Sequence, residues 1–152
     1  DATKADSLFR EKVESKDRFP IQSNTVDNIK IVFFAPLTGF ISQNFDPNSK
    51  HFAIDIVAKI GTPIKAIADG TVIFSGWTTE TGYVILLKHT NNYTSVYKHN
   101  GNLLKQQGDF VKSGEVIASV GSSGELTTGP HLHFELWSNG YAVNPKNYID
   151  FK

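Results

Sequence analysis

From residue 29 onward the chain is made of short runs rich in Val, Ile, Phe, Thr and Tyr, interrupted at short intervals by Gly, Asn, Asp or Pro. Such runs with turn residues between them predict β-strands, and no helical pattern lies between them. We therefore expect an all-β, mainly antiparallel fold, a two-sheet open sandwich or barrel-sandwich hybrid with a groove. The expected strands cover residues 30–34, 39–44, 52–57, 63–68, 71–77, 83–88, 93–98, 115–120, 131–137 and the tail near Tyr148.

The first part of the chain has a different pattern. Leu8, Phe9 and Val13 follow helical spacing among charged residues, and Pro20 ends the pattern. We expect a short N-terminal helix within an appendage of residues 1–28. Residues 29–152 then form one domain, because a chain of 152 residues is long enough for one substantial core and too short for two typical domains.

Charge and cysteine content exclude several classes of function. Fifteen basic and fifteen acidic side chains cancel, so no strong field favours nucleic acid or an anionic membrane surface. The chain contains no cysteine, which excludes disulfides, thiolate metal sites and a cysteine nucleophile. No apolar run approaches the roughly 18 residues of a membrane span.

Two histidines lie on one expected strand. Strand alternation places His131 and His133 on one face and three apolar residues on the other, namely Leu132, Phe134 and Leu136. The apolar face would be buried and both imidazoles would face the same space. Two surface histidines on a half-buried strand are the alternative.

His51 and Asp55 form a second candidate group, because positions 51, 53 and 55 of a strand share a face and only the small Ala53 lies between them. Imidazole nitrogen and carboxylate oxygen are both zinc ligands. Two histidines and one carboxylate, with a fourth position for water, match a catalytic zinc site rather than a structural one. Taken alone, this pair is also explained as a solvated His and Asp near a loop.

A third group is Tyr97-Lys-His99 at the end of a strand. Alternation predicts Tyr97 and His99 on one face, directed away from Lys98. Glu135 shares the expected face of His131 and either orients a histidine or is simply exposed. His89 has no ligand-type neighbour, and we expect a structural role for it.

The order and flanks of these groups resemble the lysostaphin-like, or LytM-type, zinc endopeptidases over residues 39–151. The matching motifs are Ser42 to Phe45, His51-x-x-x-Asp55, Gly61-Thr-Pro63, Ala68-Asp-Gly70-Thr-Val72, Gly82-Tyr-Val-Ile85, Tyr97-x-His99, Val111-x-x-Gly114, Gly121, Thr128-Gly-Pro-His-Leu-His-Phe-Glu135 and Asn144-Pro145.

The resemblance implies a zinc endopeptidase that cuts peptide cross-links or stem peptides of bacterial peptidoglycan. Zn2+ would be held by His51, Asp55 and His133. His131 would act as general base, and His99 would hydrogen-bond the developing oxyanion or orient water, although these two roles are interchangeable. The partner would be the peptidoglycan peptide, and no nucleic acid is expected. An extracytoplasmic location follows from that substrate. The oligomeric state is left open, with a monomer favoured.

Two departures from the family pattern affect the rim of the site. Ala53 stands where the family usually has glycine, and the polar stretch of residues 44–50 replaces a glycine and a later arginine. Two other kinds of function stay open: a non-catalytic module that binds peptidoglycan or activates another cell-wall hydrolase, and a zinc-stabilised binding domain. Zinc content and a cleavage assay distinguish these functions from the endopeptidase.

Overall fold

The computed structural model describes residues 31–151, and these residues form an all-β fold, as expected. The appendage and the helix expected before residue 29 lie outside the described residues. The strands are β1 (Phe40–Gln43), β2 (Ile54–Val57), β3 (Pro63–Lys65), β4 (Gly70–Thr78), β5 (Gly82–Lys88), β6 (Tyr93–Leu103), β7 (Phe110–Val111), β8 (Val116–Val120), β9 (His131–Ser138) and β10 (Tyr141–Val143). Three 3-10 turns join them: η2 (Pro47–Ser49), η3 (Thr90–Asn92) and η4 (Pro145–Asn147).

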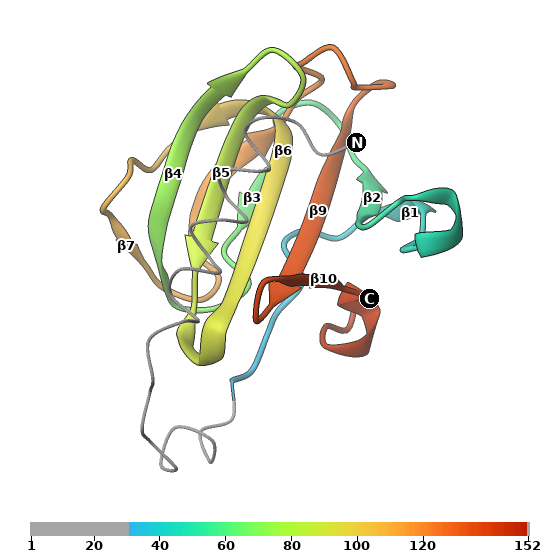
Figure 1. Cartoon of the computed structure of the whole chain (residues 1–152). Coiled ribbons are helices and arrows are strands. Elements are labelled where there is room, and N and C mark those ends of the chain that lie inside the picture. Colours follow the sequence, from blue (N-terminus) through green and yellow to red (C-terminus); the bar gives the residue numbers. More distant parts are fainter. Residues whose placement is uncertain (1–30, 152) are drawn as a thin grey trace.

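All strand pairs are antiparallel, and the main path of the sheet runs β1-β2-β9-β6-β5-β4-β7. Figure 1 shows β9, β6, β5 and β4 side by side. Strand β9 lies between β2 and β6, although about 75 residues separate it from β2 in sequence. The sheet thus brings the predicted ligand groups of β2 and β9 next to each other.

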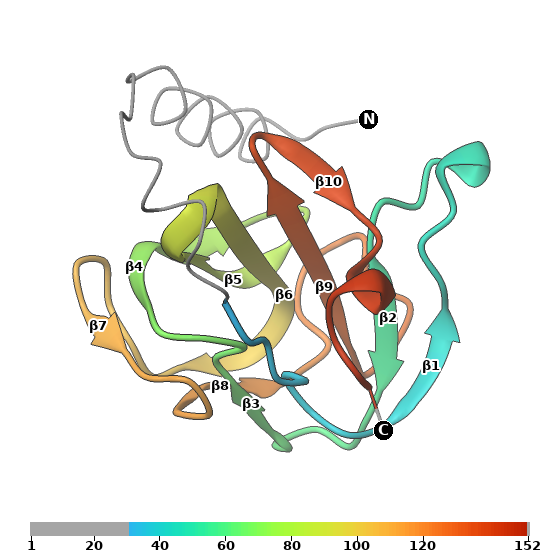
Figure 2. The same cartoon turned by 90° about the horizontal axis from the view of Figure 1, so that it is seen from below.

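The sheet folds over itself to enclose the main core. Strand β8 pairs with both β3 and β6, which brings β3 and β8 beneath one face of the long strands (Figure 2). The core contains fully buried residues from both parts, such as Ile64 and Ile117 on one side and Ile85, Tyr97 and Phe134 on the other. We call the opposite side of β2, β9, β6 and β5 the outer face.

Strand alternation decides which residues of β9 lie on the outer face. Leu132, Phe134 and Leu136 are completely buried in the core, so the prediction for this strand is confirmed. The register then pairs His133 with Asp55 on β2 and with Lys98 on β6. Directly paired residues share a face of the sheet, so these three side chains meet on the outer face.

Two predicted strands are wrong. Residues 31–34 contain no strand: Phe34 donates one backbone hydrogen bond to the Ile67 carbonyl, while Phe33 packs its ring against Tyr93. Near Tyr148 the chain forms the 3-10 turn η4 instead, because Pro145 has no N–H for a sheet ladder and the Asn144 side chain caps the turn.

The structure also contains two strands that the pattern missed, β7 and β10, which are too short to show alternation. Within residues 31–151 no helix combines the length and the apolar run that crossing a membrane would need.

Candidate metal centre

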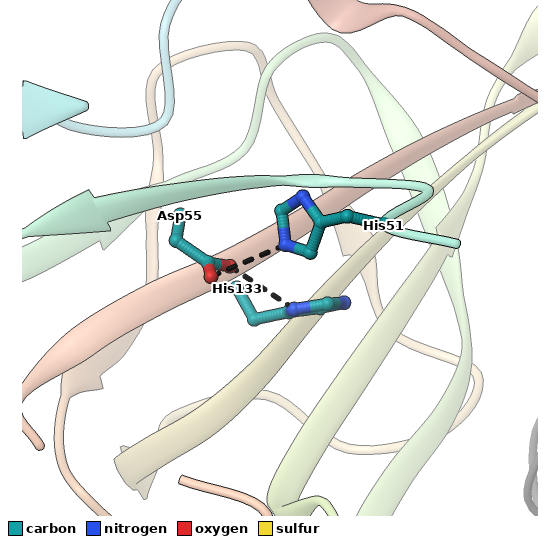
Figure 3. A group of neighbouring side chains, drawn as sticks. All are labelled: His51, Asp55 and His133. Carbon is teal, nitrogen blue, oxygen red and sulfur yellow. Dashed lines mark hydrogen bonds and ion pairs between the residues drawn. The ribbon is translucent and has the colours of Figure 1, made fainter. Parts of the chain in front are cut away.

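The side chains of His51, Asp55 and His133 converge on the outer face (Figure 3). His51 Nε2 lies 3.2 Å from Asp55 Oδ2, and His133 Nδ1 lies 3.1 Å from Asp55 Oδ1. The potential ligand atoms of these three residues are all within 4.8 Å of one another. Two imidazole nitrogens and a carboxylate oxygen at this spacing suit a zinc ion.

A short loop brings His51 to Asp55. Backbone hydrogen bonds between Asp46 and His51 close a loop around η2, and the strand itself begins only at Ile54. The two ligands therefore converge across a bend at the fully buried Ala53 and not along a regular strand, as the alternation argument assumed. The His51 ring donates from Nδ1 to the Asn44 carbonyl at 2.8 Å, which leaves Nε2 as the ligand atom.

Glu135 fixes the orientation of the His133 ring. The Nε2 of His133 donates to Glu135 Oε2 at 2.8 Å, so Nδ1 is left to face Asp55. The same carboxylate accepts from Lys98 Nζ and from Trp137 Nε1, each at 2.8 Å. Glu135 is buried, which rules out the exposed alternative and agrees with an orienting contact. Neither Lys98 nor Trp137 was predicted as a partner of Glu135: the register of β6 and β9 is needed to place Lys98, whereas the alternation of β9 already places Trp137 on the face of Glu135.

These contacts shift the acid–base equilibria of the group. Burial alone raises the pKa of Asp55, but its hydrogen bond to His133 and the neighbouring histidine charges outweigh that effect and hold the pKa below its usual value. Burial alone lowers the pKa of His133, whereas the hydrogen bonds to Asp55 and Glu135 raise it overall. The pKa of Glu135 is far below normal: burial opposes this, and the positive charge of Lys98 prevails.

Two more histidines border the group. The His131 ring donates from Nδ1 to the Gly129 carbonyl, and the His99 ring donates from Nδ1 to the Ser123 carbonyl, each at 2.8 Å. Carbonyl oxygens only accept, so Nδ1 is the donor in both rings, and in the neutral form of each ring Nε2 carries the lone pair. His131 Nε2 lies 3.9 Å from Asp55 Oδ1. The ring centroid of His99 is 5.3 Å from that of His131, and burial lowers the pKa of His99 to about 4.

The predicted arrangement around Lys98 is wrong in one respect. Tyr97 is completely buried in the core, while Lys98 lies on the outer face and binds Glu135. His99 does not join Tyr97: its φ angle of 64° breaks the alternation, and its ring turns to the outer face. The structure thus brings together all five residues expected at the site. Alternation accounts for His131 and His133, whereas His51 and His99 reach the site through a bend and a bulge.

His89 lies apart from this group, as expected for a structural residue. It is buried, its Nδ1 donates to the Asp69 carbonyl at 2.7 Å, and its Nε2 is 2.7 Å from Ser95 Oγ. The Ser95 hydroxyl in turn lies 2.9 Å from Tyr97 Oη. These contacts connect core elements and hold Tyr97 inside the fold.

A family model for peptidase family M23 matches residues 49–145, a span that includes every residue of the site. The chain belongs to peptidase family M23. This is the family of the lysostaphin-like and LytM-type enzymes, so the resemblance found in the sequence is confirmed. M23 peptidases are zinc metallopeptidases, and the nitrogen and oxygen donors of the site fit that metal.

Curated relatives include both enzymes and an activator. The chain is 36% identical over 115 residues to the peptidoglycan DD-endopeptidase ShyC of Vibrio cholerae, and this match covers 70% of the chain and 26% of the relative. It is 37% identical over 116 residues to the murein hydrolase activator NlpD of Salmonella dublin, and this match covers 75% of the chain and 30% of the relative. The chain therefore spans less than a third of the length of these M23 relatives.

Solved structures resemble the described fold. A zinc-containing peptidase from Vibrio cholerae superimposes with a TM-score of 0.72 and 30% identity, over 76% of this M23 chain and 39% of that protein. The catalytic domain of lysostaphin from Staphylococcus simulans gives a TM-score of 0.61 and 31% identity, over 81% of this chain and 93% of that domain. This match covers nearly the whole of the lysostaphin catalytic domain.

Proposed function

We propose that this M23 chain is a zinc metalloendopeptidase that hydrolyses peptide bonds in the cross-links or stem peptides of bacterial peptidoglycan. The observation that supports it best is the complete side-chain set: one potential ligand atom each from His51, Asp55 and His133 within 4.8 Å, bordered by two histidines that bind backbone carbonyls through Nδ1. The similarity to the peptidoglycan DD-endopeptidase ShyC supports peptidoglycan as the substrate class.

The chain's own residues divide the chemistry between them. A zinc ion held by His51, Asp55 and His133 would polarise the scissile carbonyl and acidify water. His131 accepts a proton from the attacking water at Nε2 and returns it to the leaving amine, while its Nδ1 stays hydrogen-bonded to Gly129.

His99 orients that water. Because its Nδ1–H is already donated to the Ser123 carbonyl, its Nε2 accepts a hydrogen bond and does not donate one to an oxyanion. Of the two roles left open by the sequence, the tautomer therefore favours water orientation.

A non-catalytic role is the second candidate, because the activator NlpD is as similar to this chain as the endopeptidase is. An activator or a zinc-stabilised binding module needs no general base, whereas His131 and His99 both present a lone pair beside the candidate ligands. That pairing favours the enzyme. Since the proposed substrate lies outside the cytoplasm, the proposed location is extracytoplasmic.

The first test combines zinc analysis with a cleavage assay. We expect one zinc per chain by elemental analysis, and release of soluble muropeptides from purified peptidoglycan that a chelator stops and added zinc restores. Zinc without release from several wall types would contradict the endopeptidase and favour the binding module. Neither zinc nor release would favour the activator.

Substitutions at two neighbouring histidines separate metal binding from base catalysis. We expect His133→Ala to lose zinc and activity together. His131→Ala should keep zinc but lose about 10²- to 10⁴-fold in kcat, the usual contribution of a positioned general base. Phe110→Ala, an exposed position on the distant strand β7, is the control and should match the unsubstituted protein. Full kcat in His131→Ala would exclude it as the base.

A further inference from the structure

His99 occupies a position from which a regular strand would direct its side chain into the core. Tyr97 points into the core and Lys98 lies on the outer face, so alternation assigns the next residue to the core again. The His99 ring instead lies on the outer face, with its centroid 5.9 Å from that of His133. A local irregularity in β6 must therefore turn the His99 side chain from the core to the outer face.

That feature is a bulge in the pairing of β5 with β6. Ile85 pairs with Tyr97 and Tyr83 pairs with Asn100, so one residue of β5 faces two residues of β6, Lys98 and His99. The extra residue changes which face a side chain reaches, a recurrent role of bulges beside active sites. At His99 the backbone is left-handed, with φ of 64°, which a non-glycine residue adopts only when its surroundings enforce it.

The side chain of Asn100 spans this bulge. It is completely buried, and its amide Nδ2 donates to the Tyr97 carbonyl at 2.8 Å and to the Tyr83 carbonyl at 3.0 Å. One acceptor lies on β6 before the bulge and the other lies on the partner strand. A single amide group therefore holds together the two backbone segments between which the bulge projects.

Ser123 connects the backbone of Asn100 to the ring of His99. Its hydroxyl donates to the Asn100 carbonyl at 2.6 Å and accepts from the Tyr83 amide at 3.1 Å, and its own carbonyl accepts from His99 Nδ1. The His99 amide donates to the Thr81 carbonyl at 2.9 Å. The backbone and ring of His99 are thus held by Thr81 and Ser123, from outside β6. Asn100 adds its backbone carbonyl, which accepts from Ser123, and its side-chain amide, which joins the Tyr97 and Tyr83 carbonyls.

We propose that Asn100 is a positioning residue for the reaction: its amide holds the β6 bulge in the form that turns His99 Nε2 toward the candidate zinc site. The amide group of Asn100 makes no hydrogen bond to the candidate ligands or to His131, so its effect on the site passes through the bulge, and the proposal assigns that effect to His99. The inference rests on the proposed function for its effect on turnover. Its effect on the His99 ring is independent of that function.

A double-mutant cycle with His99→Ala tests the proposal. Asn100→Asp keeps the shape but removes the amide donors, and we expect kcat to fall about 10²-fold, as for a misplaced catalytic group, with KM and zinc content unchanged. In a His99→Ala background the same change should lower kcat by less than about threefold, because the ring it positions is gone. If Asn100→Asp lowers kcat by the same factor with and without the His99 ring, the proposal is overturned.

A second measurement needs no activity. In the zinc-loaded protein, nitrogen-detected NMR of the imidazoles should show that Asn100→Asp exposes the His99 Nδ1 proton to exchange and leaves that of His131 protected. Unchanged His99 signals would refute the positioning role even if the protein hydrolyses nothing, so this failure is distinct from failure of the proposed function. If Asn100→Asp does not fold, Asn100→Ser retains one donor and should show a smaller effect in both measurements.

Discussion

At the scale of single residues, the site depends on a backbone conformation that most side chains avoid. A left-handed conformation costs a residue with a Cβ about 1–2 kcal/mol, and His99 adopts it with φ of 64°. The hydrogen bonds to Thr81 and Ser123 offset that cost. The surroundings thus hold this ring on the outer face in a strained conformation, as is common near functional sites.

Replacing His99 by glycine and by alanine should separate strain from side-chain loss. Both variants lose the ring, but glycine has no Cβ penalty at this φ, so we expect His99→Gly to exceed His99→Ala by about 1 kcal/mol in free energy of unfolding. Urea denaturation of the metal-free proteins measures the difference. The same pair at Phe110, on an ordinary strand, is the control and should give the opposite order. Equal stabilities at position 99 would contradict a strained backbone.

At the scale of elements, sequence alternation predicts faces only where pairing is regular. Along β9 it placed His131 and His133 opposite the buried residues, because no bulge interrupts that strand. It failed at His99, because the bulge depends on how β5 pairs with β6 and not on the residues of β6 alone. The ion pair of Lys98 with Glu135 was also unpredictable, since it exists only through the register of two strands about 40 residues apart.

That ion pair joins β6 to β9 and should be important to both stability and metal affinity. Both side chains are less than a tenth exposed, so Lys98→Met leaves the Glu135 charge buried without this partner. We expect it to lower the free energy of unfolding by about 3 kcal/mol. Adding Glu135→Gln removes the buried charge and should restore much of the lost free energy of unfolding. The neutral amide forms a weaker hydrogen bond to His133, so the double variant should bind zinc about 10-fold more weakly.

Urea denaturation of the metal-free proteins and a competitive chelator titration measure the two effects of this pair. Lys146→Met, at an exposed lysine in η4, controls for the loss of a positive charge. A double variant no more stable than Lys98→Met alone would show that the buried charge is not the cause.

At the scale of the whole molecule, His89 links distant parts of the fold and should make its stability depend on pH. The ring connects the Asp69 carbonyl, just before β4, to Ser95 on β6. Burial lowers its pKa to about 4, whereas an unfolded chain has a histidine pKa of about 6.5. The unfolded state therefore binds a proton first as the pH falls.

The protein should therefore become less stable as the pH falls. The stability from a neutral His89 is fully present above pH 6.5 and is lost as the pH falls toward 4, by up to about 3 kcal/mol at 1.36 kcal/mol per pKa unit. His89→Gln cannot take up that proton, so we expect it to be less stable than the unsubstituted protein at pH 7 but to lose less stability between pH 6.5 and 4. Urea denaturation in chelator at several pH values measures this difference. The site histidines and the carboxylates titrate in both proteins and cancel, so parallel curves would mean that His89 is protonated equally in the folded and unfolded chain.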